Sequence, residues 1–143
     1  MSENNDRARL ILHGAIVLFV GLMCGLPAVM EEGPDASRHW HTAHEALIMM
    51  GIWILTTSSL LPVLVLDGRE ARALRWCMLG LGYGFTLALL IQGVTGAPAF
   101  EPGASPVRIV EFAATTIGIL GAVMGTLITM RGAKAALDGR VID

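Results

Sequence analysis

The chain has 143 residues, of which 54% are hydrophobic and 15% charged, and its formal net charge is −2. A soluble domain of this length has about a quarter of its residues charged, so the deficit indicates a membrane protein. The slightly negative balance leaves no basic surface for nucleic acid, and the length allows one domain only. Two cysteines are too few for a disulfide framework and match no zinc spacing.

Four apolar runs follow one another along the chain: Leu10–Met30, Ala46–Leu66, Trp76–Ala99 and Val107–Met130. Each is close to the roughly 20 helical residues that cross a bilayer core. Only a helix satisfies all its backbone hydrogen bonds within one such segment. The first run is longer than the core of a signal peptide, and no Ala-x-Ala site follows it. We therefore predict an all-α, integral membrane antiparallel four-helix bundle. It forms a single membrane domain over residues 1–143, with short polar tails and helices near 10–30, 41–66, 76–99 and 107–131.

The basic residues predict an orientation. Eight of the ten lie on one side of the predicted spans: Arg7, Arg9, Arg69, Arg72, Arg75, Arg131, Lys134 and Arg140. Because Lys and Arg collect in cytoplasmic loops, we expect both termini in the cytoplasm of a multi-pass protein in a bacterial-type inner membrane. The loop that holds Arg38 then lies at the outer face, where Asp35 or Ser37 is expected to cap the second helix.

Small residues recur at a spacing that lets helices pack closely. The pairs are Gly21/Gly25, Gly80/Gly84 and Gly121/Gly125. Such pairs allow two helix backbones to approach each other, so they favour a bundle and are also typical of oligomers.

The segment His39-Trp40-His41-Thr42-Ala43-His44-Glu45 holds three of the four histidines at the edge of a predicted span. Titratable residues in such a place are costly, so they are candidates for a site. His44, Gly51 and Ser58 recur every seven residues on one helix face. A face of small residues beneath a histidine suits a planar macrocycle, and plain helix packing explains the same spacing. Trp40 fits an interfacial aromatic belt.

The other histidines leave further alternatives open. His41 and His44 are three residues apart, so with His39 they are candidates for a metal entry site, although a third ligand on the same face is missing. His13 lies near the opposite end of its span, about 25 Å from His44 by helical rise, which excludes one iron clamped by both. At His13 we expect an interfacial or interhelical hydrogen bond, with a second contact to a cofactor as the alternative. Between Arg108 and Glu111 we expect an interfacial ion pair.

Several residues in order suggest a family. His13-Gly14 opens the first span after a basic stretch, Trp40-His41-Thr42-Ala43-His44 is similar to a Trp-x-x-Ala-His motif, and Gly51 and Pro62 follow at matching intervals. In these features the chain resembles the styrene oxide isomerases, small four-helix membrane proteins of aromatic degradation. The resemblance covers nearly the whole chain.

The resemblance implies haem b held between neighbouring subunits of a homotrimer, with His44 as the axial ligand of the iron. Trp40, Gly51 and Ser58 are then expected to contact the cofactor. Ferric iron would act as a Lewis acid on the oxygen of an aryl epoxide and yield a carbonyl compound. The bilayer would supply this small hydrophobic substrate, and an apolar cavity would exclude water.

The sequence also departs from the family pattern. Met50 stands where the family has an asparagine, and Leu79–Leu90 holds only Tyr83 and Thr86 as polar groups in place of an Asn/Tyr-rich helix. Tyr83 is the candidate for a catalytic hydrogen-bond donor. Two alternatives therefore stay open beside the isomerase: a haem-binding cytochrome, sensor or carrier without this activity, and a metal-binding transporter or accessory subunit.

Overall fold

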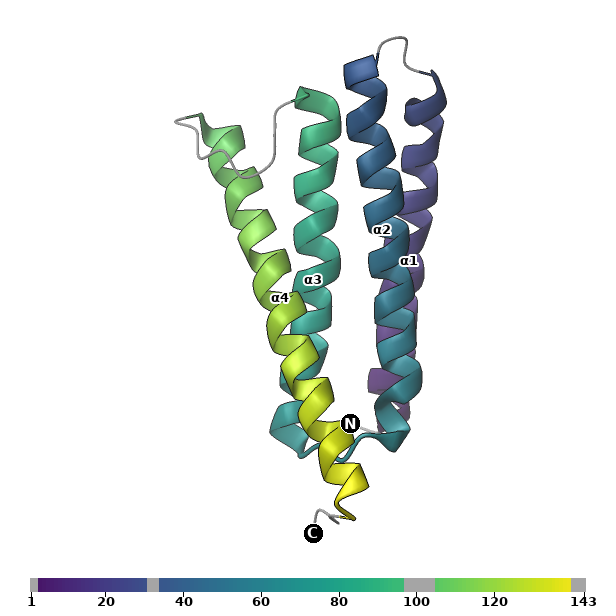
Figure 1. Ribbon diagram of the computed structural model, residues 1–143, viewed down its shortest axis with the longest axis vertical. Coiled ribbons are helices and arrows are strands. Elements are labelled where there is room, and N and C mark those ends of the chain that lie inside the picture. The colour runs from purple at the N-terminus through teal and green to yellow at the C-terminus, as the bar shows by residue number, and fades with distance from the viewer. Residues whose placement is uncertain (1–2, 31–33, 97–104, 140–143) are drawn as a thin grey trace.

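The computed structural model describes residues 3–30, 34–96 and 105–139 as an array of helices (Figure 1). The long helices are α1 (Glu3–Met30), α2 (Pro34–Leu60), α3 (Gly68–Thr95) and α4 (Pro106–Leu137), and a short 3-10 helix, η1 (Leu61–Val63), follows α2. The described ranges contain no strand. All four long helices have the length and hydropathy to cross a membrane. The predicted all-α four-helix fold of a multi-pass membrane protein is confirmed.

Consecutive helices run in opposite directions, so the molecule has two distinct ends (Figure 1). We name the end where α1 begins and α4 ends the terminal end, and the end where α1 ends and α2 begins the histidine end. The closest pairs are α1 with α2 and α3 with α4, and contacts of α3 with α2 and α1 join the two hairpins. Figure 1 shows α4 on the far side of α3 from the first hairpin.

Local chemistry sets where the helices begin and end. Before α3, the Asp67 side chain accepts from the N–H groups of Arg69 and Glu70 at 2.8 and 2.7 Å. The Glu70 carboxylate in turn accepts from the Asp67 N–H. This reciprocal capping box starts α3 at Gly68, eight residues before the apolar run. Gly96, with a φ of 64°, ends it, because glycine adopts the left-handed conformation at no steric cost.

Two predicted boundaries of the second helix were wrong. The helix begins at Pro34, not near residue 41, so Asp35 and Ser37 lie inside it and neither is its N-cap. It ends at Leu60, short of residue 66, where η1 takes over. Pro62 explains this end, since proline lacks the N–H that would continue the α-helical ladder. The early start places His44 ten residues inside the helix.

Close glycine contacts hold both hairpins. A Cβ added to Gly21 would lie 2.8 Å from the Ile48 nitrogen, and one added to Gly121 would lie 2.5 Å from the Cys77 oxygen. The predicted close packing at these glycines is confirmed. Large apolar side chains such as that of Phe19, which is 61% exposed, cover the outside of the helices. This pattern suits contact with lipid tails.

Candidate functional site

His44 projects from α2 toward α1. Its Nδ1 lies 2.8 Å from the carbonyl oxygen of Gly21. A carbonyl only accepts, so Nδ1 carries the hydrogen and donates it. In the neutral ring Nε2 then keeps its lone pair, which is the form of imidazole that binds a metal.

Glycines of α1 make the space for this ring. A Cβ added to Gly25 would lie 3.0 Å from both Cε1 and Nδ1 of His44. The ring, itself half-buried, therefore lies directly on the backbone of α1 at Gly25 and is fixed by Gly21 one turn earlier. The glycine pair that the sequence marked for helix packing thus also seats the histidine.

Gly51 and Ser58, which follow His44 at intervals of seven residues, pack inside the fold. A Cβ added to Gly51 would lie 2.7 Å from the backbone nitrogen and Cβ of Leu18, so α1 covers Gly51. Ser58 is fully buried, and its hydroxyl donates to the Leu55 carbonyl at 2.7 Å. Both positions agree with the packing alternative, and a contact of either residue with a cofactor stays a prediction.

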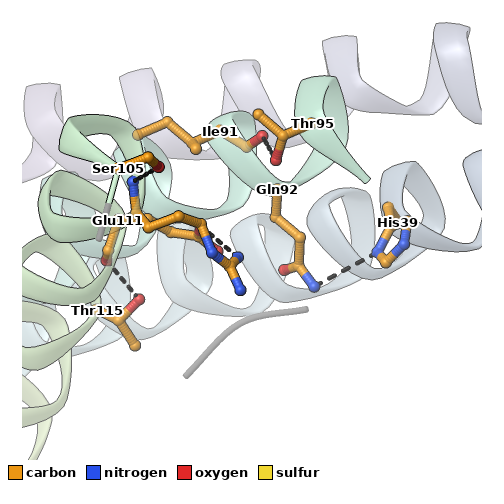
Figure 2. Close-up of polar contacts among 8 residues, drawn as sticks. His39, Ile91, Gln92, Thr95, Ser105, Glu111 and Thr115 are labelled. Carbon is orange, nitrogen blue, oxygen red and sulfur yellow. Dashed lines mark hydrogen bonds and ion pairs between the residues drawn. The ribbon is translucent and has the colours of Figure 1, made fainter. Parts of the chain in front are cut away.

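The remaining residues of the histidine segment point to other places. The Trp40 ring lies on Gly93 of α3, where an added Cβ would come within 2.9 Å of it. The His39 ring faces Gln92 of α3, and 3.4 Å separate His39 Nδ1 from the side-chain nitrogen Nε2 of Gln92 (Figure 2). His41 is exposed. Among the described residues no three His, Cys, Asp or Glu side chains gather as a metal site, so the metal-entry alternative gains no support.

A comparison with known protein families shows which family the chain belongs to. The family model of styrene oxide isomerase matches residues 6–134. The chain belongs to the styrene oxide isomerase family. No curated protein and no solved structure is detectably similar to it. The resemblance read from the His13-Gly14 and Trp40-to-His44 motifs is therefore confirmed, and both motifs lie inside the matched range.

The structure also locates the departure from the styrene oxide isomerase pattern on α2. Met50, in the place of the family's asparagine, is partly buried and packs against the hydrophobic core. Its neighbour Gly51 meets Leu18 of α1. A thioether in this position contributes apolar packing and only a very weak acceptor, so it offers a ligand no amide hydrogen bond.

His13 and Tyr83 form a pair that the sequence did not join. His13 Nδ1 and the Tyr83 hydroxyl are 2.7 Å apart, and their rings meet edge to face with centroids 5.6 Å apart. The interhelical hydrogen bond expected at His13 is confirmed. Seventy residues separate the two in sequence, so no local pattern indicates the contact. In this member of the styrene oxide isomerase family the one tyrosine is therefore held by a histidine.

The separation of His13 and His44 is smaller than expected. The His44 ring lies beside Gly21 and Gly25, eight and twelve residues beyond His13 on the same helix. At 1.5 Å per residue this is about 12 to 18 Å, against the 25 Å expected, because α2 begins earlier than predicted. The conclusion holds, since two bonds of about 2 Å each to one metal still cannot bridge the gap.

A buried carboxylate lies at the histidine end of α4. Glu111 is 2% exposed, and its Oε2 accepts from Arg108 Nη1 at 3.0 Å, which confirms the predicted ion pair. Oε1 is buried and has no partner. Figure 2 shows Glu111 on α4, with Gln92 on α3 and His39 on α2 at the same end of the molecule. The i,i+3 spacing indicated the pair, but nothing in the sequence indicated its burial.

A cavity of about 690 Å³ lies at the terminal end, away from His44. Leucines form much of its wall, and Asp6 and Arg75, which form an ion pair, also line it. It is therefore separate from the residues that surround His44.

Proposed function

We propose that this protein is a haem-b-dependent isomerase that converts an apolar aryl epoxide into a carbonyl compound, with His44 as the axial ligand of the iron. Membership of the styrene oxide isomerase family supports the reaction class. The observation that carries the assignment of the ligand is the hydrogen bond from His44 Nδ1 to the Gly21 carbonyl.

This hydrogen bond has the form found at metal-binding histidines. Such a residue nearly always donates its second ring N–H to a carbonyl or carboxylate, which fixes the ring and raises the basicity of the coordinating nitrogen. Here Gly21 supplies the carbonyl, and Gly25 leaves room for the ring. His44 is thus prepared to hold an iron through Nε2, whereas His39 and His41 lack this support.

The chain itself would contribute to the reaction by orienting the substrate and by excluding water from it. When bound, ferric haem would supply a Lewis acid for the epoxide oxygen. The apolar surfaces of the four helices admit a hydrophobic substrate from the bilayer and keep water away, and water would otherwise capture the opened ring as a diol. Hydride migration within the substrate would then give the carbonyl product without net redox change.

Assembly and orientation belong to the same proposal. We propose a homotrimer with the haem between neighbouring subunits, and the half-buried position of His44 supports a site that another copy completes. Both termini would lie in the cytoplasm, at an inner membrane of the bacterial type. The basic residues Arg72, Arg75 and Arg131, all at the terminal end, support this orientation.

The second candidate is a haem-binding membrane protein without isomerase activity, such as a cytochrome, sensor or carrier. The observation that favours it is Met50, which packs into the core where the family pattern has an asparagine. Both candidates need haem at His44 and differ only in turnover of the epoxide.

The test is an absorption spectrum of the detergent-purified protein, oxidised and then reduced with dithionite. We expect a Soret band that His44→Ala abolishes, while His41→Ala and His39→Ala, the controls from the same segment, retain it. A spectrum without a haem band, or haem retained in His44→Ala, contradicts the assignment. Conversion of an aryl epoxide to the aldehyde then separates the isomerase from the second candidate.

A further inference from the structure

The hydrogen-bonded pair of His13 and Tyr83 lies within the membrane-spanning part of the fold. Both residues fall inside helices that are long and apolar enough to cross a bilayer. Tyr83 comes eight residues after Arg75, the last charged residue of α3, which is about 12 Å along the helix. It is nevertheless 41% exposed. A phenol thus opens to the outside of the chain on a helix that is long and apolar enough to cross a bilayer, and acyl chains offer no hydrogen-bond partner.

A count of hydrogens shows what this pair lacks. A neutral histidine carries one N–H and a tyrosine one O–H, so the pair holds two donor hydrogens, and their mutual bond uses one. If His13 Nδ1–H donates, the Tyr83 O–H is left over; if Tyr83 donates, the His13 Nε2–H is left over. Neither residue has a further polar partner among the described residues. In either tautomer, one donor therefore remains to be satisfied.

We propose that the pair is a binding site for the acceptor oxygen of a small hydrophobic molecule, such as an epoxide or a carbonyl compound. These compounds accept hydrogen bonds and donate none, so they complement a site with one spare donor. The choice of an aryl epoxide and its carbonyl product rests on the proposed function, but the binding chemistry does not. His13 is the positioning residue, because its Nδ1–H, when it donates, directs the Tyr83 O–H outward.

The edge-to-face contact supports the same role. The two rings meet at 82°, which fixes the plane of the phenol as well as its oxygen. A donor held in two ways loses little freedom when a ligand binds, and this preorganisation favours affinity. His13 is half-buried, so the exposed member of the pair is the tyrosine.

The single tyrosine of the chain makes the proposal directly testable. Protein labelled with 3-fluorotyrosine gives one fluorine resonance, which reports the Tyr83 ring alone. We would titrate it in lipid nanodiscs with acetophenone, an aryl ketone, and with ethylbenzene, which has nearly the same shape without the oxygen. We expect acetophenone to shift the resonance to saturation and ethylbenzene to leave it nearly unmoved.

Two variants of His13 separate positioning from mere packing. His13→Ala should weaken acetophenone binding about five- to tenfold, the worth of one neutral hydrogen bond. His13→Asn should largely restore it, because the asparagine amide N–H occupies nearly the place of the Nδ1–H. Equal binding by all three proteins would contradict the role of His13.

Other outcomes overturn the site itself. A resonance that acetophenone does not move, or that ethylbenzene moves equally, shows that no oxygen binds at Tyr83. A resonance that changes with oligomeric state and ignores the ketone assigns the spare donor to a second copy of the chain. The proposed function fails separately, through loss of the Soret band, since the fluorine titration does not need haem.

Discussion

The two hairpins of this protein use glycine in the same way and for different ends. In the α3–α4 hairpin, Gly121 faces the backbone of Cys77 and Leu81, so two main chains touch. In the α1–α2 hairpin, Gly21 likewise faces backbone, but Gly25 faces the ring of His44. One small-residue spacing therefore serves helix association in the second hairpin, and in the first it also seats the candidate iron ligand.

The difference predicts how each hairpin responds to a small change. A backbone cannot move aside without displacing the helix, whereas a side-chain ring can shift by a few tenths of an ångström. Added bulk in α3–α4 should therefore cost folding stability, and added bulk at Gly25 should cost function. The polar contacts of the two hairpins also differ. The buried ion pair of Arg108 and Glu111 lies within α4, whereas the hydrogen bond of His44 joins α2 to α1.

The largest expected effect is at the buried ion pair of the second hairpin. Arg108→Ala leaves the buried Glu111 carboxylate without its guanidinium partner. Removing one partner of a buried pair costs about 3 kcal/mol or more in unfolding free energy. We expect a marked fall in the temperature at which the helical circular dichroism signal is lost in detergent. The double variant Arg108→Leu/Glu111→Leu should recover most of the loss, and a neutral single variant would contradict the buried pair.

Gly121→Ala comes next. The new Cβ would lie 2.5 Å from the Cys77 oxygen and 2.6 Å from the Leu81 nitrogen. Because both are backbone atoms, α3 and α4 must separate, and overpacking of this kind costs about 1–3 kcal/mol. Thermal unfolding should show the loss, while haem content per folded protein stays that of the wild type. Gly80→Ala is the control, since its nearest contact would be an ordinary 3.4 Å to Ile117.

Gly25→Ala tests the first hairpin and rests on the proposed haem site. The added methyl would press on Cε1 and Nδ1 of His44 at 3.0 Å and weaken the bond to Gly21. Changes in the support of a ligand commonly lower metal affinity by about 10- to 100-fold. We expect weaker haem retention on gel filtration with little change in unfolding temperature. Gly14→Ala, which meets Leu55 at the same 3.0 Å, should retain haem; equal loss in both variants would refute the specific role of Gly25.

The fold was predictable from sequence to the extent that it depends on local composition. Four apolar runs of membrane length specify four helices, and the glycine spacings mark the faces where they meet. Neither feature specifies which residue of one helix lies beside which residue of another. The bonds of His44 with Gly21 and of His13 with Tyr83 depend on that register, so the sequence identified His44 and Tyr83 as candidates but not their partners.

The helix ends show a different reason for error. Apolar runs mark the part of a helix that lies in lipid, whereas the helix itself continues into its polar flanks. Because α2 begins earlier than predicted, His44 lies deeper in the bundle. Its separation from His13 is therefore smaller than predicted. At α3 the pattern Asp67-x-x-Glu70 was readable as a capping box, but the apolar run that begins at Trp76 drew the predicted boundary away from it.

The smallest effect is expected at this capping box, in the connection that joins the two hairpins. Hydrogen bonds from the N–H groups of Glu70 and Arg69 hold the pKa of the Asp67 carboxyl below its usual value. A carboxyl with a lowered pKa stabilises the fold at neutral pH, and this contribution disappears as the pH falls through the folded-state pKa, below about 4. Asp67→Ala should therefore unfold at a slightly lower temperature than the wild type at pH 7, and the difference should shrink in strong acid, where the protonated Asp67 caps α3 only as a neutral acceptor.

Asp67→Asn keeps an acceptor oxygen without the charge, so it should lose less at pH 7 and show little dependence on pH. A difference between Asp67→Ala and the wild type that persists unchanged in strong acid would mean that α3 does not depend on the ionised cap. The connection between the hairpins would then be held by the apolar contacts around it.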